Sequence, residues 1–363
     1  MIKFKMIFIV ILLSGVIMAG CSSGSNAVDE QKSVSGDAQQ TEGNKEEAEE
    51  KTEVQYYYTA NEKGSISKID AVDNSIVKTI EVEGSAHNVQ VSPDGELIGA
   101  TVVPGAGHGG GHGSHGEVSA KAVFYSVERD ELVQEVEVGN HPAHIVFTHD
   151  GKYAVITNNE DNTASVIDMN SFNVTNTVET GKGPHGFRIS SDSKRAYIAN
   201  MGEDTVSVIN LETKKEEKRI KVGIAPVTTG ITSDGKTLVA SLNGENALAV
   251  VDLATEKVDK IPVGTGPAQV YIDEKGQFAY VANQGTEETP SSSVTVIDLV
   301  LKKAITEIET GKGSHGVVTS PDNKRVYVTN MFEDTVSIID KEQNKVIDTI
   351  EVIGVPNGIS ITK

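Results

Sequence analysis

The sequence predicts an all-β fold, a seven-bladed β-propeller closed by N- and C-terminal strands that share one blade. Three observations lead to this prediction: a repeat of about 42 residues, four short β-like runs within each repeat, and two incomplete repeats at the ends that complement each other. Four strands per unit at this period are typical of a propeller rather than of a helical solenoid.

Glycines open the successive units, at positions 84, 139, 181, 223, 264, 311 and 354. Within each unit, runs rich in Val, Ile, Thr and Tyr are separated by Pro-Asp-Gly or Asn/Asp turns, which is the pattern of an antiparallel meander with strands A to D. Tyr56–Val82 supplies strands B, C and D of a seventh blade, and Asn357–Thr362 supplies its strand A. Joining the two ends removes the exposed sheet edges.

The repeat motif resembles that of a known family. Tyr327-Val-Thr-Asn330 is followed by Thr335-Val-Ser337, and Tyr280–Asn283 and Tyr197–Asn200 are near matches. Over residues 54–363 the chain therefore resembles the YVTN β-propeller repeat family, which includes surface-layer and envelope proteins and has lactonase-like relatives. The resemblance implies a propeller but does not select an activity.

The amino terminus has the features of an address and an anchor. Lys3 and Lys5 precede an apolar run, so residues 1–20 are predicted to be a signal peptide. Ile17–Cys21 resembles a bacterial lipobox, with Met18 where leucine is usual. We therefore expect Cys21 to be lipidated, and the protein to be anchored at the extracytoplasmic face of the cell membrane.

Domain boundaries follow from these assignments. Residues 21–53 hold the lipidated cysteine and a polar, acidic segment with too little apolar surface to fold, and we expect a disordered tether there. Residues 54–363 form the propeller.

Charge and cysteine content restrict the partners. The chain has 52 acidic and 32 basic residues, a net charge of −20, which argues against a nucleic-acid partner. Its single cysteine excludes an internal disulfide and a covalent haem attached through two cysteines. The expected partners are the membrane, a metal ion and an envelope protein.

Histidines recur at one position of the repeat. Strand A lines the central channel, so residues at its start face one mouth. His87, His185 and His315 occupy equivalent positions there in blades 1, 3 and 6, and Asn357 occupies that position in blade 7. His149 falls in an A-to-B turn and is expected at the opposite face.

Further histidines are expected near the same mouth. In blade 2 the equivalent residue is Ala143, but His141 and His144 flank it. The B-to-C connection of blade 1 is an insertion, residues 104–121, on the same face of the disc. Its glycine-rich segment adds three histidines, His108, His112 and His115.

This concentration of imidazoles predicts a transition-metal site for zinc or copper, metals whose sites take three or four such donors. Met201 and Met331 are candidate thioether contributors, and Asn357 and Glu117 are candidate supporting residues. Two other interpretations remain open at this stage: the histidines line a wet channel, or the insertion is a solvated loop without affinity for metal.

Two other function classes also remain open. Lactonase-like relatives suggest a hydrolase or lyase in which a histidine at the channel mouth acts as general base, although no nucleophilic serine motif is present. Alternatively, the insertion at Gln284–Ser293, on the same face, suits a scaffold that binds a protein or glycan. We favour a metal-binding, lipid-anchored envelope protein without enzymatic activity.

Overall fold

The computed structural model describes residues 55–105 and 119–363. The predicted signal peptide, Cys21 and the acidic segment lie outside the described residues, as do His108, His112, His115 and Glu117 of the insertion. Within the described ranges, no helix has the length and hydropathy needed to cross a bilayer.

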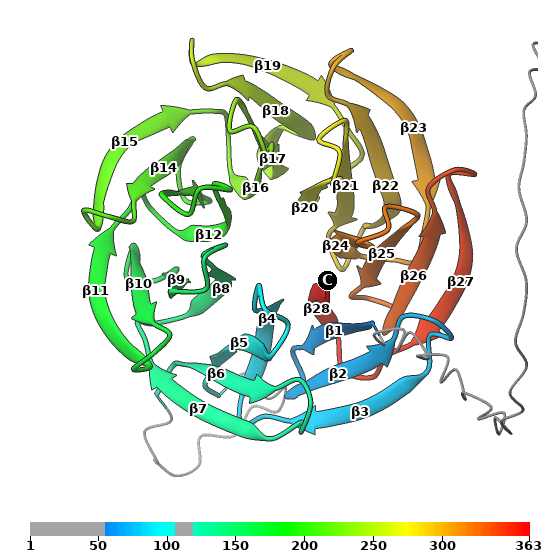
Figure 1. Cartoon of the computed structure of the whole chain (residues 1–363). Helices are drawn as coiled ribbons and strands as arrows, with labels where there is room; N and C mark the ends of the chain where they lie inside the picture. The colour runs from blue at the N-terminus through cyan, green and yellow to red at the C-terminus, as the bar shows by residue number, and fades with distance from the viewer. Residues whose placement is uncertain (1–54, 106–118) are drawn as a thin grey trace, which may run out of the picture. The chain divides into compact units, whose positions relative to one another are not determined.

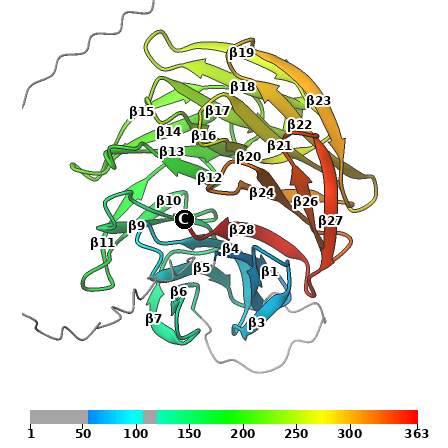
Figure 2. The ribbon, with the colours of Figure 1, turned by 45° about the vertical axis from the view of Figure 1, so that its right-hand side comes forward.

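The described chain forms seven four-stranded antiparallel sheets arranged as blades around a central channel (Figure 1). This confirms the predicted seven-bladed propeller. The blade formed by strands β28, β1, β2 and β3 joins the two ends of the propeller, because Tyr57 of β1 pairs with Ile361 of β28. β28 packs between β4 and β24, so the ring closes through this blade (Figure 2).

Each blade runs from an inner strand A to an outer strand D. Blade 1 contains β4 (Ser85–Val91), β5 (Leu97–Val103), β6 (Lys121–Ser126) and β7 (Leu132–Glu137). Blade 2 contains β8 (Pro142–Phe147), β9 (Tyr153–Asn158), β10 (Thr163–Asp168) and β11 (Asn173–Glu179). Blade 3 contains β12 (Pro184–Ile189), β13 (Arg195–Asn200), β14 (Thr205–Asn210) and β15 (Lys215–Lys221). Blades 4 and 5 contain β16 (Pro226–Ile231), β17 (Thr237–Leu242), β18 (Ala247–Asp252) and β19 (Lys257–Pro262); β20 (Pro267–Ile272), β21 (Phe278–Gly285), β22 (Pro290–Asp298) and β23 (Lys303–Glu309). Blades 6 and 7 contain β24 (Ser314–Thr319), β25 (Arg325–Asn330), β26 (Thr335–Asp340) and β27 (Lys345–Glu351); β28 (Pro356–Ile361), β1 (Tyr56–Asn61), β2 (Ser65–Asp70) and β3 (Ile76–Glu81).

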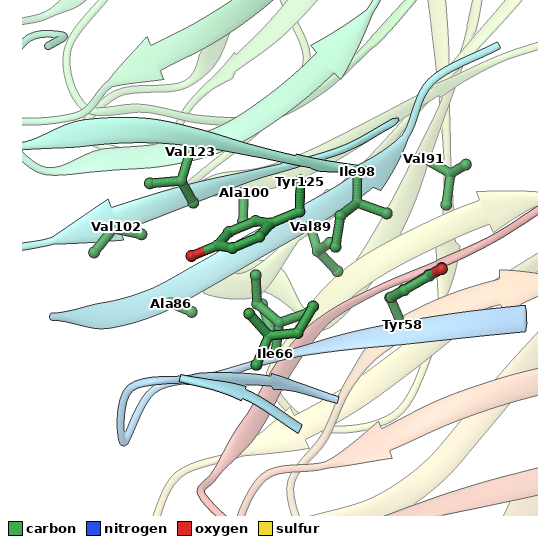
Figure 3. Close-up of a cluster of buried hydrophobic side chains, with 12 residues drawn as sticks. Tyr58, Ile66, Ala86, Val89, Val91, Ile98, Ala100, Val102, Val123 and Tyr125 are labelled. Carbon is green, nitrogen blue, oxygen red and sulfur yellow. The ribbon is translucent and has the colours of Figure 1, made fainter. Parts of the chain in front are cut away.

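Apolar side chains fill the spaces between neighbouring blades. Between blades 7 and 1, Tyr58 and Ile66 pack against Val89, Ile98 and Tyr125 (Figure 3). Tyr58 and Ile66 are fully buried, and burial of such a side chain contributes about 1.5–3 kcal/mol. Because this cluster joins the two ends of the propeller, it helps to hold the ring closed.

Buried asparagines explain the repeat motif. Four of them, Asn61, Asn158, Asn200 and Asn330, end strand B, and Asn283 lies two residues before the end of β21. In blade 6, Asn330 Nδ2 donates to the hydroxyls of Thr335 and Ser337 on strand C, at 2.9 Å each. The other four asparagines reach two strand-C hydroxyls in the same way. The motif thus gives the buried amide nitrogen its acceptors and ties strand B to strand C.

The glycine that opens the repeat has a steric reason. At Gly311, a Cβ atom would lie 2.6 Å from Asn330 Nδ2, and at Gly181 it would lie 2.3 Å from Asn200 Nδ2. Only glycine lets the D-to-A connection pass this close to the buried amide.

Candidate metal centre at the upper mouth of the channel

A β-bulge in every strand A prepares the site. In blade 3, Pro184 pairs with Asn200 and Phe187 with Ile198, so that His185 and Gly186 together oppose the single residue Ala199. The same register shift occurs in the other six blades. A bulge redirects side chains, so either of two consecutive residues can face the channel. We call the end of the channel where strand A begins the upper mouth, and the other end the lower mouth.

Each blade contributes a polar side chain from this bulge. In blades 2, 4 and 5 it is the second bulge residue, and in the other blades the first. We call this set the upper ring: His87, His144, His185, Thr228, Gln269, His315 and Asn357.

Threonine hydroxyls from strand B hold the bulges. Thr157 Oγ1 accepts a hydrogen bond from the backbone N–H of His144 at 3.0 Å and donates one to the carbonyl oxygen of His185 at 2.8 Å. One buried hydroxyl therefore fixes the backbone of two neighbouring histidines. Ser241 does the same for Thr228 and Ala268 in the next part of the ring.

Three imidazoles of the upper ring converge. His87, His144 and His185 each offer one ring nitrogen, and these three atoms lie within 4.8 Å of one another. The closest pair is His87 Nε2 and His185 Nε2, at 3.4 Å. A tetrahedral zinc ion with Zn–N bonds of about 2.0–2.1 Å separates two ligand nitrogens by about 3.3 Å. The pair therefore has the spacing of two ligands of one ion.

The other nitrogens of this pair are already engaged. His185 Nδ1 lies 3.2 Å from the carbonyl oxygen of Val227, to which it donates. His87 Nδ1 lies 3.4 Å from Glu62 Oε1 and 3.3 Å from Asn357 Nδ2. We assign a proton to His87 Nδ1, which donates a hydrogen bond to Glu62, since a carboxylate is the strongest acceptor available. Both Nε2 atoms then present lone pairs toward each other, an arrangement that a cation between them would stabilise.

His144 completes the triad. Its side chain is 1% exposed, and neither of its ring nitrogens has a hydrogen-bond partner among the described residues. Its ring centroid lies 4.9 Å from that of His185 and 6.1 Å from that of His87. A buried imidazole without a hydrogen-bond partner lowers the stability of the fold. We therefore interpret His144 as a side chain that is available to bind a ligand.

Burial sets the protonation state of the ring. Removal from water, reinforced by the charges of neighbouring histidines, lowers the pKa of His185 to about 3 and that of His144 well below its usual value. Burial likewise lowers the pKa of His315 to about 4. These imidazoles are neutral at pH 7, which is the form that binds metals.

Glu62, in the β1–β2 turn, is the charged partner of the site. Burial alone would raise its pKa, but hydrogen bonds from His87 and Asn357 hold the pKa at about 2. Asn357 Nδ2 donates to Glu62 Oε1 at 2.7 Å. Glu62 is therefore a carboxylate at neutral pH, and it orients His87 as such groups orient metal-bound histidines.

The remaining predicted residues lie around the triad. His315 is buried in the upper ring but outside the triad, and its Nδ1 lies 3.4 Å from Gln269 Nε2. His141 is exposed beside Glu160, with its Nδ1 3.5 Å from a carboxylate oxygen and its ring 6.4 Å from that of His87. Asn357 supports Glu62.

The methionines do not join the triad. Met331 is buried, and its sulfur accepts a hydrogen bond from Gln284 Nε2 at 3.2 Å, while Met201 is 42% exposed. His149 lies in the β8–β9 turn at the lower mouth, as its place in the repeat predicts.

Sequence reasoning missed two contributors, and it named His144 and His315 together as metal ligands. It placed His315 with His87 and His185, whereas the structure groups His144 with them, because the bulge allows the second residue to face the channel. A signal was available in the alternation at the bulge: Gly186, Gly316 and Gly358 follow the polar residues, whereas His144 follows a small alanine. No sequence pattern marked Glu62 or Thr157, which the tertiary fold brings to the site.

Solved structures similar to this one show the fold. The Kuenenia stuttgartiensis hydrazine synthase chain matches with a TM-score of 0.65 and 20% identity over 76% of this chain and 89% of that chain. A Desulfotomaculum acetoxidans protein of unknown function matches with a TM-score of 0.71 and 13% identity over 84% of this chain and 98% of that chain. A putative 6-phosphogluconolactonase from Bacteroides fragilis matches with a TM-score of 0.67 and 15% identity, over 86% and 99%. At these identities, the likeness concerns the propeller alone.

Family membership comes from the sequence. No curated protein matches the chain. The profile of one propeller family does match, over residues 127–363, which span blades 2 to 6 and the closing strand, and this confirms the resemblance to YVTN-type repeat proteins. The chain belongs to the YNCE-like β-propeller family.

Proposed function

We propose that this protein binds a transition-metal ion, zinc or copper, through His87, His144 and His185 at the upper mouth. One observation carries the proposal: the Nε2 atoms of His87 and His185 face each other at 3.4 Å while both Nδ1 atoms have acceptors, and the third imidazole has no other partner among the described residues. The neutral state of the buried imidazoles supports it, because protons do not compete with the metal near pH 7.

Three histidines leave a fourth position free. A tetrahedral ion held by three imidazoles takes water or another ligand there, in contrast to a structural zinc site closed by four side chains. We infer a site suited to exchange, and we assign the histidines of the insertion, His108, His112 and His115, to the capture of ions that then reach the triad. Imidazole-only ligation suits both zinc and copper(II).

The cellular setting that we propose rests on the sequence. The lipobox-like Ile17–Cys21 segment supports a lipid anchor at Cys21 on the extracytoplasmic face of the membrane, with residues 21–53 as the tether. In that setting the protein would buffer or deliver metal in the cell envelope, with an envelope protein as recipient.

A specific contact supports a second candidate. The Glu62–His87 pair has the arrangement of a carboxylate that orients a general base, and a putative lactonase is among the structural neighbours. A hydrolase or lyase acting at the same mouth would lose turnover in His87→Gln without added metal, whereas the metal-binding function predicts no lactone hydrolysis in either form.

The test separates the triad from the insertion. In the full chain purified without an affinity tag, the combined substitutions His108→Gln, His112→Gln and His115→Gln remove the three imidazoles of the insertion. Isothermal titration of this background with Zn²⁺ and Cu²⁺ should give one bound ion per chain. Adding His87→Gln and His185→Gln should weaken binding at least about 100-fold, because two of three ligands are lost.

The matched control is His149→Gln in the same background, since His149 is exposed at the lower mouth. This change should leave the affinity unaltered. Equal metal affinity in the control and the double variant would overturn the proposal.

A further inference from the structure

A second ring of side chains lines the channel toward its lower mouth. It lies four residues after the proline that begins most A strands, beyond the bulge. We call this set the lower ring: Gln90, Val146, Arg188, Gly230, Tyr271, Val318 and Ser360. All seven line one or both of two adjoining cavities of about 170 and about 140 Å³ at that end of the channel.

Arg188 supplies the guanidinium group of the lower ring. Its Cζ lies 5.5 Å from the ring centroid of Tyr271, two blades away. Gly230 occupies the intervening blade and lines the same cavity as Arg188 and Tyr271. Planar guanidinium over an aromatic face is a favourable geometry, and it fixes the side chain in the cavity.

The guanidinium has donors to spare. Nη1 donates to the carbonyl oxygen of Phe187 at 2.9 Å, and among the described residues no other hydrogen bond or ion pair engages the guanidinium. Exposed arginines of the same chain, Arg129 and Arg195, pair with Glu131 and Glu217. Loss of hydration lowers the pKa of Arg188, and Tyr271 only partly offsets this shift. A desolvated cation without a counter-ion is costly, so the cavity favours an anion.

The other charged groups of the cavities do not neutralise Arg188. Asp273 lines one cavity, but Lys341 pairs with it at 3.2 Å. Glu274 and Lys363 line both cavities, and neither forms an ion pair with Arg188. Among the described residues that line these cavities, Arg188 therefore has no ion-pair partner.

We propose that the lower ring is a second ligand site, which binds a small oxyanion of the carboxylate or phosphate class through the Arg188 guanidinium and the Tyr271 hydroxyl. A guanidinium presents parallel N–H donors that match two oxygens of such a group. Each cavity is several times larger than the roughly 30 Å³ that one water occupies. This site shares no side chain with the histidine triad.

Titration calorimetry of the full chain in a chloride buffer tests the proposal, with inorganic phosphate and malonate as separate probes. One of them should bind with one-to-one stoichiometry, and the preferred probe identifies the class of oxyanion. Arg188→Gln should weaken binding at least about tenfold, because charge-assisted hydrogen bonds are lost. Arg129→Gln is the matched control, with the same change in net charge and no part in the cavity, and it should leave the affinity unchanged.

A measurement on the unaltered protein covers the case in which Arg188→Gln fails to fold. Phenylglyoxal modifies accessible arginines, and mass spectrometry of the peptides gives the extent at each one. Phosphate or malonate should protect Arg188 and leave Arg129 unprotected. Absence of binding by both probes at millimolar concentration, or equal modification of Arg188 with and without them, would overturn the proposal.

Discussion

At the upper mouth of the channel, imidazole nitrogens face one another, whereas at the lower mouth a guanidinium lies over an aromatic ring with most of its donors unused. The same seven A strands build both ends, and His185 and Arg188 are only three residues apart on β12. His185 lies in the bulge and Arg188 lies beyond it. Within the bulge, a strand can present either of two residues to the channel, and beyond it each strand presents one residue in fixed alternation.

This difference shows how a repeated fold creates unlike sites. Repetition sets the positions, and single substitutions in individual blades set the chemistry. Donors that suit a cation gather in blades 1 to 3 of the upper ring, while Arg188 and Tyr271 of blades 3 and 5 make the lower ring suited to an anion. The two mouths share no ligand side chain, so the residues of each can be substituted separately.

The largest expected effect separates two buried histidines of the upper ring. His144→Gln should weaken zinc binding at least about 100-fold, because it removes a ligand, whereas His315→Gln should change the affinity less than about threefold. Competition with a chromogenic chelator gives both values in the background without the insertion histidines. Similar losses in the two variants would mean that the ion sits nearer the centre of the ring than the triad.

The next effect concerns the carboxylate that orients His87. Glu62→Gln should weaken zinc binding by about 10- to 100-fold, because the amide no longer fixes the Nδ1 proton and adds no charge. Glu160→Gln, beside the exposed His141, is the control and should have little effect. Phosphate or malonate binding at the lower mouth should be unchanged in both variants, and a parallel loss at that mouth would point to misfolding instead.

Acid should destabilise the metal-free protein through the buried histidines of the upper mouth. The folded-state pKa of His315 is about 4, below its usual value of 6.5. The unfolded chain therefore takes up a proton between those pH values while the folded protein does not, so this contribution to stability is present above pH 6.5 and is lost as pH falls. The slope is about 1.4 kcal/mol per pH unit.

Urea unfolding from pH 7 to pH 4.5, in the presence of a chelator, measures this slope. His315→Gln should reduce the slope by the contribution of one histidine, whatever its effect on stability at pH 7. Parallel curves for the variant and the unaltered protein would contradict the buried, neutral state of His315.

The smallest expected effect is an influence of the lower mouth on metal affinity at the upper mouth. The charge of Arg188 contributes to the lowered pKa of His144, so it also opposes a metal ion in the triad. Arg188→Gln should therefore raise zinc affinity severalfold, and Arg129→Gln should not. An unchanged affinity in Arg188→Gln would show that the two rings are electrostatically independent.

Much of the fold was predictable from residues near one another in the chain. Asn330, with Thr335 and Ser337 close after it in the chain, forms a buried hydrogen-bonded unit. At position 311, glycine is the only residue type that fits against this unit. The residues of such a unit lie close together in the chain, so the repetition of the motif in the sequence indicates the number and order of the blades. The complementary ends, Tyr56–Val82 and Asn357–Thr362, predicted the closing blade because one supplies three strands of the repeat and the other supplies the missing strand A.

The candidate site was predictable only in part. Equivalent positions in the repeat identified His87 and His185, since repeats superimpose equivalent residues. The choice of His144 over His315 was not predictable from spacing, because the bulge decides which of two neighbours faces the channel. Glu62 lies in the β1–β2 turn and Asn357 in β28, at opposite ends of the chain, and only closure of the ring brings them to His87.

The sequence alone thus determined the seven-bladed architecture, its closure, and the mouth at which most histidines gather, because periodic local interactions encode all three. Its reading of Cys21 and residues 21–53 as a lipid anchor and tether stays a prediction. The tertiary structure decided which imidazoles meet, which nitrogen of each is available, and where an unpaired arginine lies. Those properties depend on distances across the channel between blades, and such distances arise only when the ring is closed.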